Sequence, residues 1–214
     1  MSKFVSKWTG PKTPSIKKKL SRRFRKEAPN KSKLNSAIKS IQIQMASVDR
    51  VLLKLKDRDN FLLKSTIRSL KSRNENKANI LANELSQIRN LIRQVTSARL
   101  ALEQISMRMK TITDLGDAVA TLAPAVAAIR GVQDTVTTVM PQTDNSFSEI
   151  SNLLSSILVD AGQSGGLQLD FKAATLDAEK ILDDASTIAE KEIKSKLPEI
   201  PAELSIPNTE KLNA

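Results

Sequence analysis

Two long series of apolar residues with coiled-coil spacing constrain the fold of this chain more than any other feature. In the first series the apolar positions alternate steps of three and four residues, which places them along one side of an α-helix. Asp59 stands where the next apolar residue belongs. The series predicts one helix of roughly 35–40 residues, flexed near Asp57–Asn60. Its apolar positions are Leu34, Ile38, Ile41, Met45, Val48, Leu52, Leu55, Leu62, Leu63, Ile67 and Leu70.

The second series has a matching length and follows a short polar stretch, Arg73–Lys77, that suits a turn between antiparallel helices. It runs from Leu81 to Ile112, with a gap at Arg99. The two series predict an antiparallel helical hairpin, with helices at about 33–72 and 77–113. Two helices alone bury too little apolar surface, so further helices are expected to pack on them.

Residues 114–160 supply these further helices. Gly116 is a weak point, because glycine costs about 1 kcal/mol relative to alanine inside a helix. Pro124 either kinks the next helix or starts a new one, and Pro141 ends that segment. Asp144 or Asn145 can cap a short apolar helix that follows. The chain is therefore expected to be all-α: a long antiparallel hairpin with further short helices packed on it.

The chain divides into six predicted segments. The first is basic and mostly disordered, since Pro11, Pro14 and Pro29 interrupt it. The fifth contains three prolines and is extended, because proline cannot continue a helix. The segments are a basic arm (1–31), a helical core (32–160), a flexible Gly/Ser linker (161–170), an acidic amphipathic helix (171–195), a proline segment (196–207) and a tail (208–214). The apolar face of the acidic helix is loose and consists of Phe171, Ala174, Ala178, Ile181, Leu182, Ala185, Ile188 and Ile193.

Composition excludes several classes of function. The chain has no cysteine and no histidine, so it can form neither a disulfide framework nor a Cys/His zinc site. The glycines near residue 165 are not followed by the Lys-Ser/Thr of a phosphate loop. No apolar run approaches the ~18 residues of a membrane span, and the N-terminus is no secretory signal. We expect no enzyme, no cofactor, no metal site and no small-molecule substrate.

Charge is strongly segregated along the chain. Residues 1–110 hold 27 Lys and Arg against 7 Asp and Glu, whereas residues 111–214 hold 7 against 16. A basic half predicts a polyanionic partner, either an anionic membrane surface or nucleic acid. Aromatic residues make up only 3% of the chain, so nucleic acid is expected to bind only non-specifically. The alternative is a solvated charged surface without a partner.

The basic arm holds two candidate membrane-binding elements. Phe4, Val5 and Trp8 fall together on a helix beside Lys3 and Lys7, which is typical of a small interfacial wedge, although a frayed start is the alternative. A dense cationic cluster follows them, with Ile16, Leu20 and Phe24 spaced four apart within it. The cluster consists of Lys17, Lys18, Lys19, Arg22, Arg23, Arg25 and Lys26.

Several runs resemble the ESCRT-III family, in particular archaeal CdvB-type cell-division proteins. Residues 77–85 (KANILANEL) are similar to the start of the family's second helix, and residues 97–105 (SARLALEQI) to its middle. Residues 114–124 resemble the archaeal continuation, and residues 139–154 the junction of the third and fourth helices. The resemblance covers about residues 33–160 and the architecture of the tail. The winged-helix segment of some members is missing, as in a shorter paralogue.

The resemblance implies a subunit of a membrane-associated filament that remodels or severs membrane necks, in archaeal cell division or in vesicle budding. The partners would be copies of itself and paralogous ESCRT-III subunits, on the cytoplasmic face of the cell membrane at the division site. The acidic helix would fold back on the basic hairpin as an autoinhibitory element. Deletion of residues 171–214 is therefore expected to promote assembly.

The proline segment is similar to a type-2 MIT-interacting motif, which lies extended in a groove of the MIT domain of a CdvC-type AAA ATPase. The matching residues are Leu197, Pro198, Ile200, Pro201 and Leu204. Polyproline II repeats every three residues, so Leu197 and Ile200 share one edge of such a segment. Prolines also reduce the entropy lost on binding. The alternative is a proline-terminated linker that binds nothing.

Overall fold

The computed structural model describes residues 16–112, 115–165 and 171–198, with side chains for 31–112, 120–161 and 173–198. Within these residues the chain is all-α, which confirms the predicted fold class, and contains no strand. The helices are α1 (Ile16–Lys71), α2 (Glu75–Lys110), α3 (Leu115–Val139), the 3-10 helix η1 (Pro141–Thr143), α4 (Asp144–Gly165) and α5 (Phe171–Lys196).

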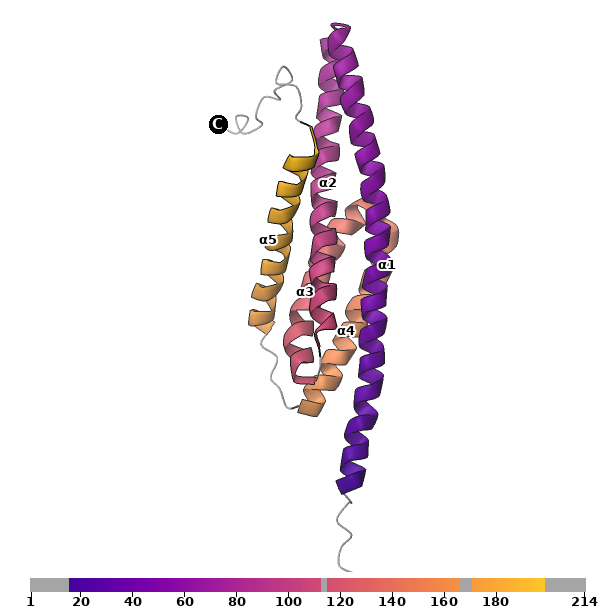
Figure 1. Ribbon diagram of the computed structural model, residues 1–214, viewed down its shortest axis with the longest axis vertical. Coiled ribbons are helices and arrows are strands. Elements are labelled where there is room, and N and C mark those ends of the chain that lie inside the picture. Colours follow the sequence, from indigo (N-terminus) through magenta and orange to yellow (C-terminus); the bar gives the residue numbers. More distant parts are fainter. Residues whose placement is uncertain (1–15, 113–114, 166–170, 199–214) are drawn as a thin grey trace, which may run out of the picture.

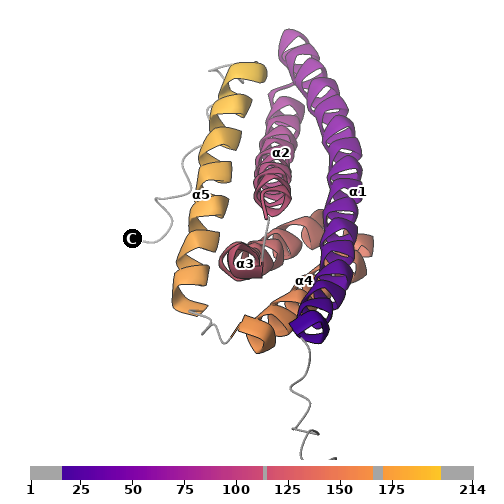
Figure 2. The same cartoon turned by 60° about the horizontal axis from the view of Figure 1, so that its bottom comes forward.

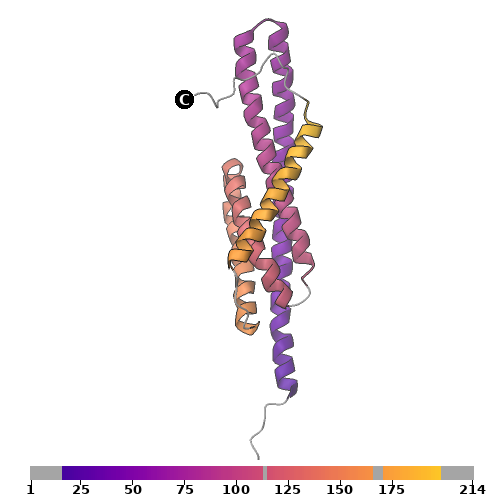
Figure 3. The same ribbon diagram turned by 90° about the vertical axis from the view of Figure 1, so that its left-hand side faces the viewer.

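Helices α1 and α2 form the predicted antiparallel hairpin, and the other helices pack along it (Figure 1). Helix α4 packs against α1 and α3, while α5 lies along α2 and α3. Figure 2 shows α1 and α5 on opposite sides of α2. The tip of the hairpin extends beyond α3 and α4, as Figure 3 shows. No helix in the described ranges combines the length and apolar character needed to cross a membrane.

The turn of the hairpin lies at residues 72–74. Arg73 adopts a left-handed backbone conformation with φ 54°, which lets the chain reverse within a few residues. The side chain of Asn74 accepts a hydrogen bond of 3.1 Å from the backbone N–H of Lys77 and so caps α2. This cap satisfies one of the free N–H groups at the start of the helix.

The polar residues at the gaps of the two apolar series, Asp59 and Arg99, each form an ion pair with a residue of the other helix. The Arg89 guanidinium donates to the carboxylate of Asp59, with an Nε–Oδ1 distance of 2.7 Å. The Arg99 guanidinium donates to Asp49 at 3.1 Å. The partners are 30 residues apart in one pair and 50 in the other, and both pairs are centred on Asn74. The two ion pairs therefore match a single register, and α1 continues as a helix through Asp57–Asn60.

The structure differs from the predicted segments at two boundaries. Helix α1 begins at Ile16, so residues 16–31 are helical rather than part of a mostly disordered arm. Residues 17–27 are rich in Lys, Arg, Leu and Glu, which favour helices. Helix α4 continues to Gly165, so residues 161–165 do not belong to a linker. Ala161 is buried in the core, and this packing outweighs the low helix propensity of the glycines.

Helix α3 passes through Pro124 without ending. A proline inside a helix costs about 3 kcal/mol, because it lacks the N–H and crowds the preceding turn. Around Pro124 lie Leu122, Ala125, Val126 and Ala128, all buried. Burial of several apolar side chains offsets that cost. The sequence left open whether Pro124 kinks a helix or starts a new one, and the structure has one helix that contains Pro124.

Candidate interaction surfaces of the hairpin and α5

Helix α5 docks on the body of the molecule through small apolar residues. Its buried positions recur at steps of three and four residues and face α2 and α3. Side chains this short allow the helix axes to approach closely. The buried residues are Ala174, Ala178, Ile181, Ala185 and Ala189, with Leu182 and Ile193 partly buried beside them.

Four residues of the predicted apolar face, Phe171, Ile181, Leu182 and Ile188, were expected to make the autoinhibitory contact, and the structure does not place them alike. Ile181 is fully buried and Leu182 is partly buried against the core. Ile188 is 45% exposed, so its assignment to the docking face is wrong. Ala189 takes that place instead, because a small residue fits where two helices approach closely. The side chain of Phe171 lies outside the described residues.

Gly131 of α3 forms the closest part of the α5 contact. A β-carbon at this position would lie 2.8 Å from Cδ1 of Leu182. A real β-carbon does not tolerate such a distance, so the absence of a side chain lets Leu182 rest on the backbone of α3. This contact could not be predicted from the sequence, where Gly131 is only an isolated glycine in a helix.

We predict that Gly131→Ala and Gly131→Val differ clearly in their effect on the docking of α5. Alanine gains about 1 kcal/mol in helix propensity, and the Leu182 methyl can turn away, so the unfolding free energy should change by less than about 1 kcal/mol. Leu182 cannot turn away from the branched side chain of valine so easily, so Gly131→Val should weaken the docking of α5 by about 1–3 kcal/mol. Amide hydrogen exchange of α5 measures the difference. Unchanged exchange in Gly131→Val would contradict the contact, and Leu182→Ala should restore protection in that variant.

Most acidic side chains of α5 are exposed to solvent. Glu179, Asp183, Asp184 and Glu190 are exposed. Within the described residues the ion pairs of α5 join neighbours on the helix itself, namely Asp177 with Lys180 and Glu192 with Lys196. The contact between α5 and the body is therefore apolar. The acidic residues of α5 contribute negative charge to the surface and do not form ion pairs with the hairpin among the described residues.

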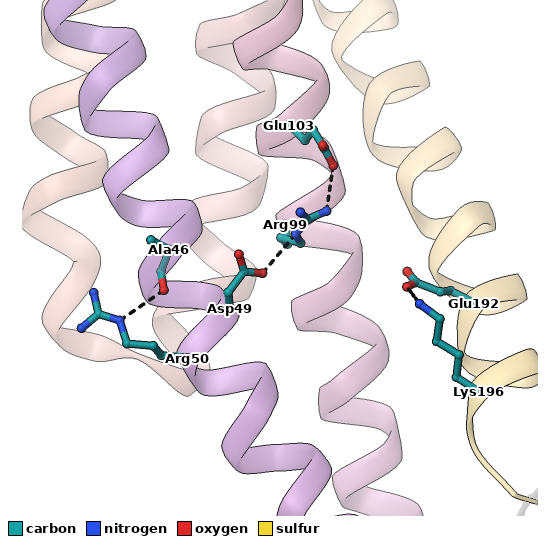
Figure 4. A network of polar contacts seen from close by, with 7 residues as sticks. All are labelled: Ala46, Asp49, Arg50, Arg99, Glu103, Glu192 and Lys196. Atoms are coloured by element: carbon teal, nitrogen blue, oxygen red, sulfur yellow. Dashed lines mark hydrogen bonds and ion pairs between the residues drawn. The ribbon is translucent and has the colours of Figure 1, made fainter.

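The Glu192 carboxyl of α5 lies within electrostatic reach of the hairpin. A hydrogen bond from Lys196 lowers the pKa of its carboxyl, with further attraction from Lys56 and Arg99, against a rise from burial. Because the pKa is lowered in the folded protein, the ionised Glu192 stabilises the fold. This stabilisation is complete above the ordinary glutamate pKa and is lost as the pH falls through the lowered pKa. Arg99 itself binds Asp49 and Glu103, as Figure 4 shows.

The hairpin carries a strongly basic surface. Residues 31–112 contain 17 Lys and Arg against 6 Asp and Glu, and Asp49, Asp59, Glu84 and Glu103 already bind arginines within the hairpin. Much of the excess positive charge therefore faces solvent. The exposed lysines without an ion pair in this described range include Lys39, Lys54, Lys64, Lys71 and Lys77.

Most residues predicted to bind membrane or an ATPase lie outside the described side chains. Phe4, Val5 and Trp8 precede the described residues. The backbone of Lys17–Lys26 belongs to α1, but their side chains are not described. In the proline segment, the N–H of Leu197 donates to the carbonyl of Ile193 at 2.9 Å, its side chain packs partly against the core, and Pro198 is exposed. Ile200, Pro201 and Leu204 lie outside the described residues.

Comparison with known proteins gives two informative relatives from the archaeon Sulfolobus acidocaldarius. Cell division protein B1 is 31% identical over 174 residues, which are 81% of this chain and 81% of that protein. Cell division protein B is 26% identical over 187 residues, 86% of this chain and 72% of that protein. No protein-family profile matches the chain, and no solved structure does either. With this identity and coverage, and with an all-α hairpin fold, the chain belongs to the CdvB-type ESCRT-III family of cell division proteins.

Proposed function

We propose that this protein acts in archaeal cell division as a subunit of a membrane-associated filament that remodels or severs the membrane neck. The family gives the role in division. The observation that carries the membrane part is the basic hairpin, with 17 cationic residues against 6 acidic ones in residues 31–112. Each Lys or Arg near an anionic surface contributes about 1 kcal/mol, and polymerisation multiplies this weak attraction.

In this proposal α5 holds the subunit closed. It seats on α2 and α3 through alanines and a single fully buried isoleucine, so it buries less apolar area per turn than a helix of large side chains. A cover of this kind can leave without unfolding the hairpin, which rests on its own core and ion pairs. Release of α5 frees α2 and α3 for contacts with other copies or with paralogous subunits.

Disassembly by a CdvC-type AAA ATPase through Leu197, Pro198, Ile200, Pro201 and Leu204 is the final part of the proposal. The exposed Pro198 directly after α5 supports it, because an extended segment can enter a groove of an MIT domain without unfolding the body. The protein would then act at the inner face of the cell membrane, at the division site.

The first test is sedimentation of the full chain with anionic liposomes, with electron microscopy of the pellets and RNA as competitor. Replacement of Lys17, Lys18 and Lys19 by Gln should weaken binding by about tenfold, since each charge contributes about 1 kcal/mol before screening. Replacement of Lys180, Lys191 and Lys194 on α5 is the matched control with the same change in charge. Binding that RNA abolishes, without filaments or tubules, would favour a non-specific nucleic-acid-binding protein instead.

A further inference from the structure

One side of α2 carries amides instead of charges between α5 and the turn of the hairpin. Side chains three or four residues apart lie on one side of a helix, and on this part of α2 such a series consists of exposed Asn and Gln. The series continues the side on which α5 lies, since Gln94 and Ser97 line the α2–α5 contact together with Leu182. We name the residues Asn76, Asn79, Ile80, Asn83, Gln87 and Asn90 the amide face of α2.

The amide face is unlike the rest of the hairpin. It runs for about four turns without a charged residue, although residues 31–112 contain 17 Lys and Arg and 6 Asp and Glu. Helix propensity does not explain it, because Asn is a poorer helix former than Lys, Glu or Ala. Asn90 accepts a hydrogen bond from Arg93 at 2.6 Å, and Ile80 is 68% exposed. The face therefore presents amide groups and one apolar side chain to a partner.

The chain leaves the folded body beside this face. The N–H of Leu197 donates to the carbonyl of Ile193, and the Leu197 side chain packs against the core, so the described backbone is held in place as far as Pro198. The hairpin extends beyond this end of α5 (Figure 3). Here α2 and α5 enclose a hollow of about 430 Å³, lined by Ser86, Gln87, Arg89, Asn90, Arg93 and Ile193.

We propose that the amide face binds residues 199–207 of this chain as an extended segment. The face runs 11 residues from Gln87 to Asn76, which is about 16 Å along the helix. A segment in the polyproline II conformation covers this length with about five or six residues, at about 3.1 Å per residue. Residues 198–203 therefore reach the turn of the hairpin, and Ile200 lies at the level of the exposed Ile80.

The chemistry of the segment matches that of the face. An extended segment has no internal backbone hydrogen bonds, and side-chain amides both donate and accept. Pro201 and Pro207 have no N–H but keep their carbonyl oxygens, so the segment has more acceptors than donors. The NH₂ groups of Asn79 and Asn83 supply donors to these carbonyls, while Ile200 covers the apolar side chain of the face.

The charges beside the amide face favour an acidic segment. Residues 199–207 contain two Glu and neither Lys nor Arg. Arg73, Lys77 and Arg93 are exposed near the face, and within the described side chains none of them takes part in an ion pair. Glu75 is an exposed carboxylate that opposes the segment, whereas Glu84 already binds an arginine of α1. The surroundings of the face therefore carry a net positive charge.

Covalent attachment favours this segment over a second copy of the chain. An interface between two copies needs a contiguous apolar core, and the amide face has one large apolar side chain. A segment attached at one end binds at an effective concentration in the millimolar range, so a few hydrogen bonds and one apolar contact suffice. A docked segment is withheld from other partners, so an MIT domain has to displace it; this consequence alone rests on the function proposed above.

Disulfide trapping in the full chain tests the docking. The chain has no cysteine, so Asn79→Cys with Ala202→Cys creates a single pair. Arg68→Cys with Ala202→Cys is the matched control, because the register that pairs Asp59 with Arg89 places Arg68 level with Ile80 on the other helix. The intramolecular disulfide should form at least about tenfold faster in the first pair. Equal rates, or disulfides mainly between chains, would overturn the proposal.

Amide hydrogen exchange reads the segment without cysteines. The N–H groups of residues 199–207 should exchange at least about tenfold more slowly in the parent protein than in a triple variant that lacks three amides of the face. A control variant lacks three exposed amides of α1 and should exchange like the parent protein. Alanine keeps α1 and α2 helical in both variants. The substitutions are Asn79→Ala, Asn83→Ala and Gln87→Ala on the face, and Asn35→Ala, Gln42→Ala and Asn60→Ala in the control.

The same variants distinguish the docking from recognition by the ATPase. Equal exchange in the parent protein and the amide-face variant overturns the docking, whether or not an isolated MIT domain binds the chain. Slow exchange in the parent protein alone supports the docking, and the amide-face variant should then bind the isolated MIT domain several-fold more tightly. If that domain binds neither protein while the exchange difference persists, the docking stands and recognition through the proline segment fails.

Discussion

Asp59→Ala is expected to lower the free energy of unfolding by about 3 kcal/mol, because it breaks a buried ion pair of the hairpin and leaves one charge unpaired. The Asp59 side chain is completely buried, and that of its partner Arg89 is only 16% exposed. Removal of the carboxylate leaves a guanidinium inside the hairpin without its counter-charge, and the desolvation of that charge is no longer compensated. Urea unfolding followed by circular dichroism measures the loss.

The matched control is Asp49→Ala, which breaks the other ion pair of the same register. Asp49 is 50% exposed, and its partner Arg99 keeps a second carboxylate, Glu103. Exposed pairs contribute about 0–1 kcal/mol, so this variant should remain close to the parent protein. A loss in Asp59→Ala no larger than in Asp49→Ala would show that the buried pair does not hold the hairpin.

A double variant distinguishes the contribution of the pair from the penalty of breaking it. Asp59→Leu with Arg89→Met fills the same space with apolar groups, and such replacements are often neutral or stabilising by about 1–4 kcal/mol. We expect the double variant to be at least as stable as the parent protein. The pair would then act mainly on the register of the hairpin, since it and Asp49–Arg99 are centred on the same residue, Asn74.

The hairpin could be predicted from the sequence because its information is local and periodic. The two apolar series define which side of each helix is buried, and the polar stretch after Lys71 places the turn. The gap at Asp59 was visible, but the series could not show that Arg89 fills it. That pairing depends on the register, and the register is known only once the turn residue is known.

The position of α5 was harder to predict for a physical reason. The apolar face predicted from the sequence includes Ala174, Ala178 and Ala185, and these residues are buried. It also includes the large Ile188, whereas the small Ala189 is buried instead, because close helix approach selects small residues. The other half of the contact is Gly131, which carries no hydropathy signal. Burial of Ala161 likewise extends α4 into the glycine-containing segment that composition alone assigns to a linker. Each of these differences reflects packing between segments far apart in the sequence.

Ile181→Asp is expected to release α5 and to increase the mass of sedimentable polymer several-fold. Ile181 is 1% exposed in the α5 contact, and a carboxylate buried there without a partner costs more than the alanine seam can offset. Ile188→Asp introduces the same group seven residues later at a position that is 45% exposed, so it should behave like the parent protein. Deletion of residues 171–214 should match Ile181→Asp if α5 alone keeps the subunit closed.

Because the hairpin keeps its own core and ion pairs, circular dichroism of Ile181→Asp should retain most of its helical signal. More polymer from Ile181→Asp alone would place the autoinhibitory contact on the buried face of α5, whereas equal amounts from both variants would remove α5 from the control of assembly.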